Sequence, residues 1–429
     1  MLDIRQIREE PQMVVAALKK KGMDAAAVIA EILSLDTKRR DLIQSTEQNK
    51  AEQNKVSKQI PMLKKAGEDV APIMAKMKNL SAEIKAADGD LRRIETEYEA
   101  AMLSLPNLPD ADLPGGGKEN NESVREFGAA KTFDFAPRDH VELCTNLGLI
   151  DYERGAKLSG SGFWIYRGMG ARLEWALLNF FIDTHITNGY EFILPPHILG
   201  YEAGLTSGQF PKFEEDVFWM QTARDEARRW LLPTSETVLA NLHCGEILDE
   251  TELPRKYVSY TPCFRREAGS YRTDERGMVR GHQFNKVEMF QFVKPEQSDA
   301  AFDEMVRHAE YLVEALGFHF RTVRLAAGDC SASMARTYDI EIHIPSMGGY
   351  KEVSSVSNAR DYQARRGLIR FRGATGKPEL VHTLNGSGLA TSRILPAIVE
   401  QNQRADGSVV IPEVLRKYLG GAELLTKPE

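Results

Sequence analysis

The first third of the chain places apolar residues at alternating steps of four and three. The series covers residues 28–63, breaks at residues 66–69 and resumes over residues 73–105. A 3.5-residue repeat on both sides of one short turn predicts two helices whose seams bury each other, an antiparallel α-helical coiled-coil arm. The predicted seam consists of Val28, Ile32, Leu35, Arg39, Leu42, Thr46, Asn49, Gln53, Val56, Ile60 and Leu63, followed by Ile73, Met77, Leu80, Ile84, Ala87, Leu91, Ile94, Tyr98, Ala101 and Leu105.

The pattern changes after about Thr132. Apolar residues at helical spacing over residues 173–184 precede Asn188-Gly189 and a short apolar strand at residues 190–194. Further along, β-rich or alternating runs flank one amphipathic helix at residues 299–316. These runs span residues 256–266, 282–293, 337–344, 350–357 and 379–383. The runs are joined by hairpin-length or somewhat longer loops. Such connections favour an α+β domain, in which helices flank an antiparallel sheet.

The segment between the two patterns is rich in residues that interrupt helices and strands. It carries Pro106, Pro109 and the consecutive glycines of residues 115–117. We therefore predict a helical arm domain at residues 1–109, a linker at residues 110–131 and a mixed domain at residues 132–429.

Composition excludes several classes of protein. With 42% hydrophobic and 27% charged residues and a net charge of −7, the chain is neither disordered nor collagen-like. It has no apolar run of membrane-spanning length and no apolar leader, so we expect a cytoplasmic protein without a membrane partner. The cysteines form no CxxC pair, which argues against a disulfide framework or a closed cysteine zinc site.

Basic residues outnumber acidic ones on the first predicted arm helix. The basic residues are Lys38, Arg39, Arg40, Lys50, Lys55, Lys58, Lys64 and Lys65. Such a strip suits a polyanion such as RNA, although a solvated coiled-coil face is the commoner explanation of a charge run.

The predicted sheet carries charged residues where strands usually do not. They are Arg265, Arg266, Glu267, Glu288, Glu341, Glu352 and Arg393. Buried charges must pair with each other or with a charged ligand, so we expect a polar cavity. We also predict a turn at residues 385–388 that enters a helix, which together with these charges would suit a phosphate and a metal ion. Neither a GxxxxGK[ST] loop nor a GxGxxG turn after a strand is present.

Several of these segments resemble the signature motifs of class II aminoacyl-tRNA synthetases. The helix and strand that end at Pro196 resemble the first motif, residues 264–267 with 277–288 the second, and residues 384–393 the third. Residues 233–236 resemble the serine-specific loop, and the arm resembles the tRNA-binding arm of seryl-tRNA synthetases. The match covers essentially the whole chain in order. It implies a coiled-coil arm joined to a class II synthetase antiparallel β-sheet flanked by helices.

The resemblance implies an ATP site. Arg265 would bind the α-phosphate, and Phe284 would stack on adenine, with Arg393 on the other face and near the γ-phosphate; without the motif, Phe284 would be an ordinary strand aromatic. Glu352 and Ser355 would hold Mg²⁺, which takes hard oxygen ligands beside phosphate oxygens. The catalytic residues would be Arg265, Glu352 and Arg393. The full implied ATP site is Arg265, Arg266, Glu267, Phe284, Glu352, Val353, Ser354, Ser355 and Arg393.

The resemblance also implies a pocket for L-serine. Thr234 and Glu236 would receive the ammonium, and Glu288 the ammonium or the hydroxyl. The implied serine-binding residues are Thr234, Ser235, Glu236, Arg265, Glu288, Asn385 and Ser387. A site built to hydrogen-bond a hydroxyl rejects alanine, because buried polar groups left unpaired are costly. The implied activity is that of a serine–tRNA ligase whose arm binds tRNA(Ser). The resemblance implies no DNA partner. It also implies a homodimer that forms through residues 188–196.

Some positions depart from the family pattern and leave alternatives open. They are Arg272, Asn285, Ser331, Ser333 and Ser392, with Pro396 inside the third-motif helix. The chain could be a specialised copy that resists seryl-adenylate-like antibiotics or supplies seryl-tRNA to biosynthesis. It could also be a non-catalytic RNA-binding scaffold or a ligase that loads serine onto a carrier protein. Whether tRNA(Sec) is also charged stays open.

Overall fold

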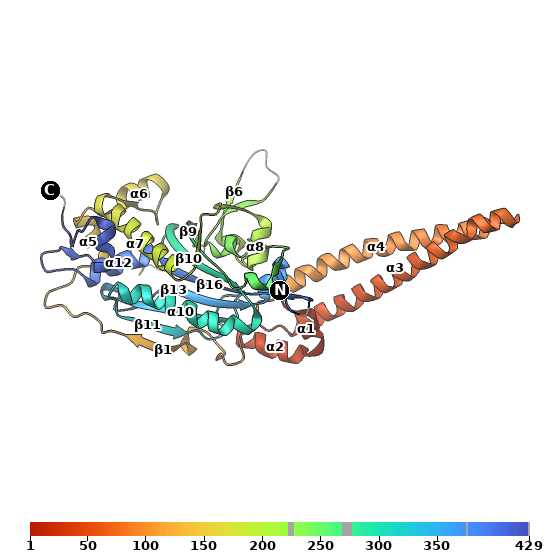
Figure 1. Ribbon diagram of the computed structural model, residues 1–429, viewed down its shortest axis with the longest axis horizontal. Helices are drawn as coiled ribbons and strands as arrows, with labels where there is room; N and C mark the ends of the chain where they lie inside the picture. Colours follow the sequence, from red (N-terminus) through yellow and green to blue (C-terminus); the bar gives the residue numbers. More distant parts are fainter. Residues whose placement is uncertain (222–226, 268–276, 375, 428–429) are drawn as a thin grey trace. The chain divides into compact units, whose positions relative to one another are not determined.

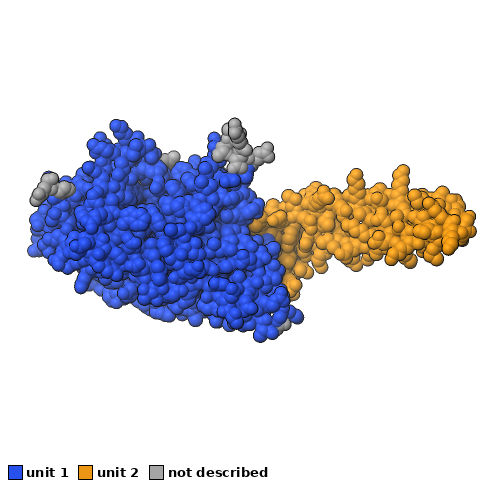
Figure 2. Space-filling model, turned by 45° about the horizontal axis from the view of Figure 1, so that its top comes forward, with its two compact units in different colours: residues 1, 20–22, 107–429 blue, residues 2–19, 23–106 orange. Residues whose placement is uncertain are grey.

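The computed structural model describes residues 1–221, 227–267, 277–374 and 376–427, so Arg272 lies outside the described residues (Figure 1). The chain divides into two compact units (Figure 2). One contains residues 2–19 and 23–106, and the other contains Met1, residues 20–22 and residues 107–429.

The first unit is helical and contains the predicted arm. Two short helices, α1 (Ile4–Glu9) and α2 (Pro11–Lys20), precede the long helices α3 (Ala26–Ala66) and α4 (Ala71–Ser104). Every predicted seam residue is at least partly buried, while most positions between them are exposed. Gly67 ends α3 in the left-handed conformation, with φ 77°, and its N–H bonds the Leu63 and Lys64 carbonyls. The coiled-coil prediction is therefore confirmed.

The second unit is built on a mostly antiparallel sheet (Figure 1). Its strand order is β1, β11, β12, β13, β16, β10, β9, β4, with only β4 parallel to its neighbour. The bounds of these strands are β1 Glu122–Phe127, β11 Phe320–Arg324, β12 Arg336–Ile344, β13 Gly349–Arg360, β16 His382–Ala390, β10 Gln283–Val293, β9 Arg255–Phe264 and β4 Glu191–Ile193. The predicted α+β class is thus confirmed.

Smaller sheets and helices complete this unit. The remaining strands are β2 Ile150–Asp151, β3 Ile165–Tyr166, β5 Ile198–Gly200, β6 Phe218–Met220, β7 Arg229–Leu231, β8 Ile247–Asp249, β14 Arg370–Arg372, β15 Pro378–Leu380, β17 Val409–Val410 and β18 Leu424–Leu425. The helices are α5 His140–Asn146, α6 Tyr152–Ser159, α7 Gly168–Thr187, α8 Tyr201–Ser207, α9 Glu236–Leu239, α10 Ser298–Ala315, α11 Tyr362–Gly367, α12 Thr391–Gln401 and α13 Glu413–Arg416.

The main core lies between the large sheet and helices α7, α10 and α12. Leu177 and Phe181 of α7, Met305 of α10 and Ile398 of α12 are fully buried there with Met289 of β10. Burying these apolar faces supplies most of the drive to fold, at about 25 cal/mol per Å² removed from water. The core packs against the central strands, and β10, β13 and β16 among them carry Phe284, Glu288, Glu352, Ser355, Asn385 and Ser387 of the predicted site.

The predicted turn at residues 385–388 is wrong. These residues lie inside β16, which pairs with β10 on one side and β13 on the other. The small residues are there because neighbours approach closely: a Cβ on Gly386 would meet the Met305 sulfur at 3.0 Å, and one on Gly388 would meet His185 Nε2 at 2.2 Å. A Gly-rich run is usually a loop, but at the centre of a covered sheet it makes room for a helix.

Residues expected to form a linker include an edge strand. Glu122–Phe127 forms β1, which pairs with β11. All six of its residues are exposed, so no apolar alternation marked it in the sequence. Upstream, the Asp110 carboxylate accepts hydrogen bonds from Arg336 and Arg360, which attaches this segment to β12 and β13.

Two further expectations concern features that the structure lacks in its described residues. No helix among them combines the length and apolar character needed to cross a bilayer. The thiols of Cys144, Cys244, Cys263 and Cys330 are all free.

Candidate active site

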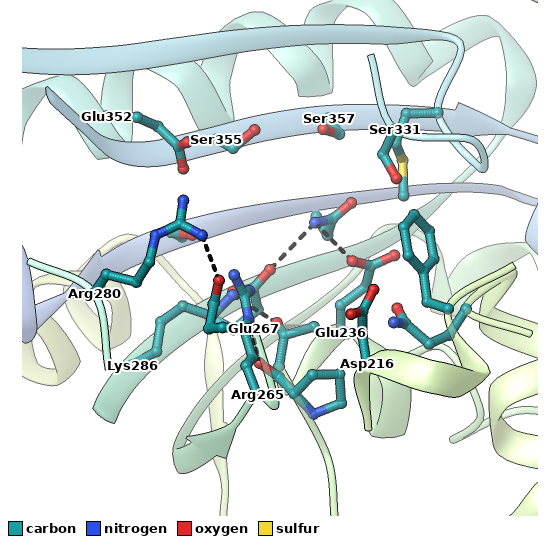
Figure 3. Close-up of a pocket in the computed structure, with 18 residues that line it drawn as sticks. Asp216, Glu236, Arg265, Glu267, Arg280, Lys286, Ser331, Glu352, Ser355 and Ser357 are labelled. Carbon is teal, nitrogen blue, oxygen red and sulfur yellow. Dashed lines mark hydrogen bonds and ion pairs between the residues drawn. The ribbon is translucent and has the colours of Figure 1, made fainter. Parts of the chain in front are cut away.

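A polar cavity of about 530 Å³ opens over the central strands (Figure 3). Glu352, Ser355 and Ser357 of β13 face it from one side, and Arg265, Glu267 and Lys286 face it from the other. The predicted site residues that line it are Thr234, Glu236, Arg265, Glu267, Glu288, Glu352, Ser355, Asn385 and Ser387. Segments far apart in sequence therefore bring most of the predicted residues to one place.

A second cavity adjoins the first and shares several of its walls. It is lined by Phe284, Val353 and Arg393, together with Arg265 and Glu352 from the first cavity. All predicted site residues except Ser235, Arg266 and Ser354 therefore line one of the two cavities.

Three predicted site residues point elsewhere. Ser235 is buried, and its hydroxyl contacts the Thr261 hydroxyl at 2.7 Å. The Ser354 hydroxyl donates to the Ser387 carbonyl at 2.6 Å, inside the sheet. Arg266 is exposed and donates to the Glu215 carbonyl at 3.1 Å. For Ser354 the reason is strand geometry, because adjacent residues of β13 point to opposite faces and its neighbours Val353 and Ser355 line the cavities.

Two carboxylates in the first cavity, the buried Glu288 and the partly buried Glu236, approach the same amide group. The Asn385 side-chain amide donates to Glu236 Oε2 at 3.3 Å and to Glu288 Oε1 at 3.2 Å. Gln363 Nε2 donates to Glu236 Oε1 at 2.8 Å. Burial, followed by the nearby Glu288 charge, raises the pKa of Glu236 to about 7. This end of the cavity is therefore suited to a cation that also forms hydrogen bonds.

Lys286 completes this group and was not among the residues predicted from the sequence. Its Nζ donates to Thr234 Oγ1 at 2.6 Å and lies 2.5 Å from Glu288 Oε2 in an ion pair. The residue is only 6% exposed. A signal was available, because residues two apart on a strand share a face and Lys286 lies two positions before Glu288 in β10.

Arginine and glutamate side chains form the wall opposite β13. The Arg265 guanidinium lies over the Phe284 ring, 5.3 Å from its centroid, and its Nε donates to the Pro233 carbonyl at 3.3 Å. Arg280, also missed, pairs with Glu267 at 2.6 Å. This wall presents fixed positive charge to an anionic ligand.

The third-motif helix brings Arg393 to the second cavity. Arg393 lies in the first turn of α12, and its Nη1 donates to the Glu352 carbonyl at 2.6 Å. The Glu352 carboxylate lies 3.6 Å from the same guanidinium nitrogen. Arg393 and Glu352 therefore lie together in the lining of the second cavity.

Oxygen donors near Glu352 fit a divalent cation that also binds substrate oxygens. Asp339 pairs with Ser355 across β12 and β13, is 9% exposed, and has no partner for Oδ1 within the described residues. Burial, followed by the Glu352 charge, raises the pKa of Asp339 well above its usual range. No group of three or more His, Cys, Asp or Glu in the described ranges could hold a metal ion by itself. A Mg²⁺ ion here would need phosphate oxygens to complete its shell, as is common for this ion.

Two family models match the chain. The "Seryl-tRNA synthetase N-terminal domain" matches residues 1–109, and the "tRNA synthetase class II core domain (G, H, P, S and T)" matches residues 218–402. The chain is 57% identical to serine–tRNA ligase 2 of Clostridium acetobutylicum, over 99% of this chain and 100% of that protein. It is 46% identical to serine–tRNA ligase of Nitratidesulfovibrio vulgaris, over 99% and 100%.

A solved structure is similar over the whole length. The seryl-tRNA synthetase of Pyrococcus horikoshii, complexed with ATP, matches with a TM-score of 0.93 and 35% identity, and 100% of each chain is covered. The order of arm and sheet, the connected cavities and these full-length matches agree, and the chain belongs to the seryl-tRNA synthetase family of class II aminoacyl-tRNA synthetases.

Proposed function

We propose that this protein is a serine–tRNA ligase that activates L-serine with ATP and transfers the seryl group to tRNA(Ser). The observation that carries the proposal is the pair of Glu236, which is partly buried, and Glu288, which is buried, joined by Asn385 in the cavity that also holds Arg265 and Glu352. It offers an ammonium site and a phosphate site within one enclosed space. The family relationship supports the same assignment.

Serine binds at the carboxylate end. Its ammonium lies against Glu236 and Glu288, and Asn385 Oδ1, which has no partner among the described residues, accepts a hydrogen from its ammonium or hydroxyl. Ser387 adds a further hydroxyl to the lining. Alanine would leave these buried groups unpaired, and each such group costs about 1–3 kcal/mol.

Adenylation needs no general base, because the serine carboxylate is already ionised at neutral pH. One of its oxygens attacks the α-phosphorus of ATP, an acyl–phosphate bond forms, and pyrophosphate leaves. Arg265 stabilises the charge that develops on the α-phosphate, and Arg393 binds the departing phosphates. Glu352 and Ser355 would hold Mg²⁺, which neutralises phosphate charge when bound. Phe284 offers its ring to the adenine in the second cavity.

Transfer follows when the terminal ribose hydroxyl of the tRNA attacks the acyl carbon and AMP leaves. We assign tRNA binding to the arm domain, residues 1–109, and catalysis to residues 132–429. The basic strip supports this assignment, since Lys38, Lys55, Lys58, Lys64 and Lys65 of α3 are all exposed. Such lysines bind phosphate backbones and make affinity dependent on salt.

We also propose a homodimer through the first-motif region. Trp175 of α7 is 54% exposed and lies beside Tyr260, and Phe192 and Leu194 at the edge strand β4 are exposed as well. An apolar edge of this kind invites a second copy. Light scattering should give a mass near twice 48.1 kDa, and a monomeric mass at working concentration would contradict the assignment.

The deciding experiment is serine-dependent ATP–pyrophosphate exchange followed by charging of total tRNA. Both should occur, and sequencing the charged RNA would show whether tRNA(Sec) is included. Exchange without charging would favour a carrier-protein ligase. Absence of both would favour a non-catalytic scaffold.

A specialised copy is a second candidate, and two departures from the family pattern support it. Ser331 lines the first cavity and Ser392 lines the second. Extra side chains at these walls would exclude a bulkier adenylate analogue by steric clash. The test is the inhibition constant of a non-hydrolysable seryl-adenylate analogue against the wild type and the Ser331→Gly and Ser392→Gly variants. Equal constants would remove the support for this candidate.

A further inference from the structure

The side chain of Lys286 lies at the junction of the two connected cavities. It lines the first together with Glu236 and Glu288, and it lines the second together with Phe284. Its ammonium is nearly excluded from water, since the side chain is 8% exposed. A lysine in such a position must be satisfied by nearby acceptors, because an isolated buried charge is very costly.

The contacts of Lys286 determine how Thr234 can act. An ammonium has three donors and no acceptor, so Thr234 Oγ1 accepts in their 2.6 Å contact. One lone pair of that hydroxyl is then occupied, and its proton is left to be donated elsewhere. Thr234 lines the first cavity, and its hydroxyl there is oriented by the contact with Lys286.

Lys286 also balances the two carboxylates. Glu288 Oε2 lies 2.5 Å from its ammonium, while Glu288 Oε1 and Glu236 share the Asn385 amide. Within this group the lysine is the cation that opposes the mutual repulsion of the carboxylates. The contact also fixes the rotation of the Glu288 carboxylate, with one oxygen on Lys286 and the other on Asn385.

We propose that Lys286 is a positioning residue for the amino-acid substrate, which orients the Thr234 hydroxyl and the Glu288 carboxylate and balances the charge of the Glu236–Glu288 pair. The inference rests on the proposed function, since it takes the first cavity as the serine site. It assigns Lys286 no contact with a reacting atom. Its loss should therefore weaken serine binding selectively and leave ATP binding intact.

The test uses Lys286→Met, which keeps the length of the side chain and removes its charge. Serine KM in pyrophosphate exchange should rise about 10- to 100-fold, the range expected when a hydrogen bond to a charged group is lost. The ATP KM should stay within about twofold. Lys286→Gln, which can still donate to Thr234 but carries no charge, should give a smaller rise in serine KM and serves if the methionine variant does not fold.

The matched control is Lys256→Met on the neighbouring strand β9. Lys256 pairs with Glu304 of α10 at 2.7 Å and lines neither cavity, so its loss removes an ion pair between β9 and this helix without touching the site. Its serine KM should equal that of the wild type.

The possible outcomes separate the two proposals. Unchanged serine KM in both Lys286 variants would overturn the positioning role alone. Parallel changes in serine KM, ATP KM and kcat, with a lower melting temperature, would also overturn it and indicate a structural role. Absence of serine-dependent exchange in the wild type would overturn the proposed function itself and the role of Lys286 with it.

Discussion

The arm and the cavity each pair a lysine with a carboxylate, but in opposite surroundings. In the arm, Lys50 and Asp88 lie 3.3 Å apart with side chains 52% and 38% exposed. In the cavity, Lys286 and Glu288 lie 2.5 Å apart with side chains 8% and 1% exposed. Water solvates the Lys50 and Asp88 side chains whether or not they pair. The Lys286 and Glu288 side chains are shielded from water, so only neighbouring protein groups can stabilise their charges.

This difference in exposure indicates which charged residues mark a ligand-binding site. An exposed pair contributes little to stability, and its residues are free to meet a mobile polyanion. A buried pair costs free energy unless it is fully satisfied, and an open side of such a cluster marks the place of a charged ligand.

The largest effect is expected at Arg265. Arg265→Ala removes the charge that stabilises the reacting phosphate and should lower the rate of pyrophosphate exchange by about 10²- to 10³-fold with the fold intact. The control is Arg255→Ala at the other end of β9, which loses only an ion pair with Glu252 and should retain exchange. Exchange at the wild-type rate in the Arg265 variant would refute its assignment.

Removal of the arm should separate the two half-reactions. When a short linker replaces residues 37–104, exchange should stay near the wild-type rate, because α3 and α4 form their own seam within a separate compact unit. Charging of tRNA should fall by about 10²-fold or more, since phosphate contacts supply much of RNA affinity. Equal loss of both activities in a folded variant would show that the arm contributes to adenylation.

The Glu236 carboxylate should make serine binding depend on pH. Because the pKa of Glu236 is raised to about 7, this group gains a proton as pH falls through 7 and then attracts the serine ammonium less strongly. Serine KM should rise as pH is lowered from 8 to 6, by at most about tenfold per unit. The Glu236→Gln variant should lack this dependence, and a flat wild-type profile would argue against an ammonium site at Glu236.

The smallest effect is expected at the exposed arm pair. Replacing Lys50 and Asp88 together by alanine should change the free energy of unfolding by about 0.5 kcal/mol or less, as measured by urea denaturation. A loss of several kcal/mol would mean that exposed and buried pairs in this protein are not energetically distinct.

The sequence specified the arm almost completely, because a helix seam depends on local spacing. Each residue from Val28 to Leu105 at the predicted steps is at least partly buried. The central strands were also predictable, since β9, β10, β12 and β13 begin and end within a few residues of the runs seen in the sequence. The motif positions indicated which residues would share a site.

Other features depended on contacts between distant segments. Strand β1 has no apolar alternation and is held by β11, and the glycine-rich residues 385–388 form a strand because β10 and β13 bond both of its edges. Ser235, Arg266 and Ser354 were expected at the site, but their side chains make hydrogen bonds outside the two cavities. Lys286 and Arg280 acquired their partners only when the strands and the loop before β10 came together. The periodicity of the sequence determines which face of a helix or strand is apolar. Which polar groups face each other is decided by packing alone, because the burial and pairing of charges are properties of the assembled sheet.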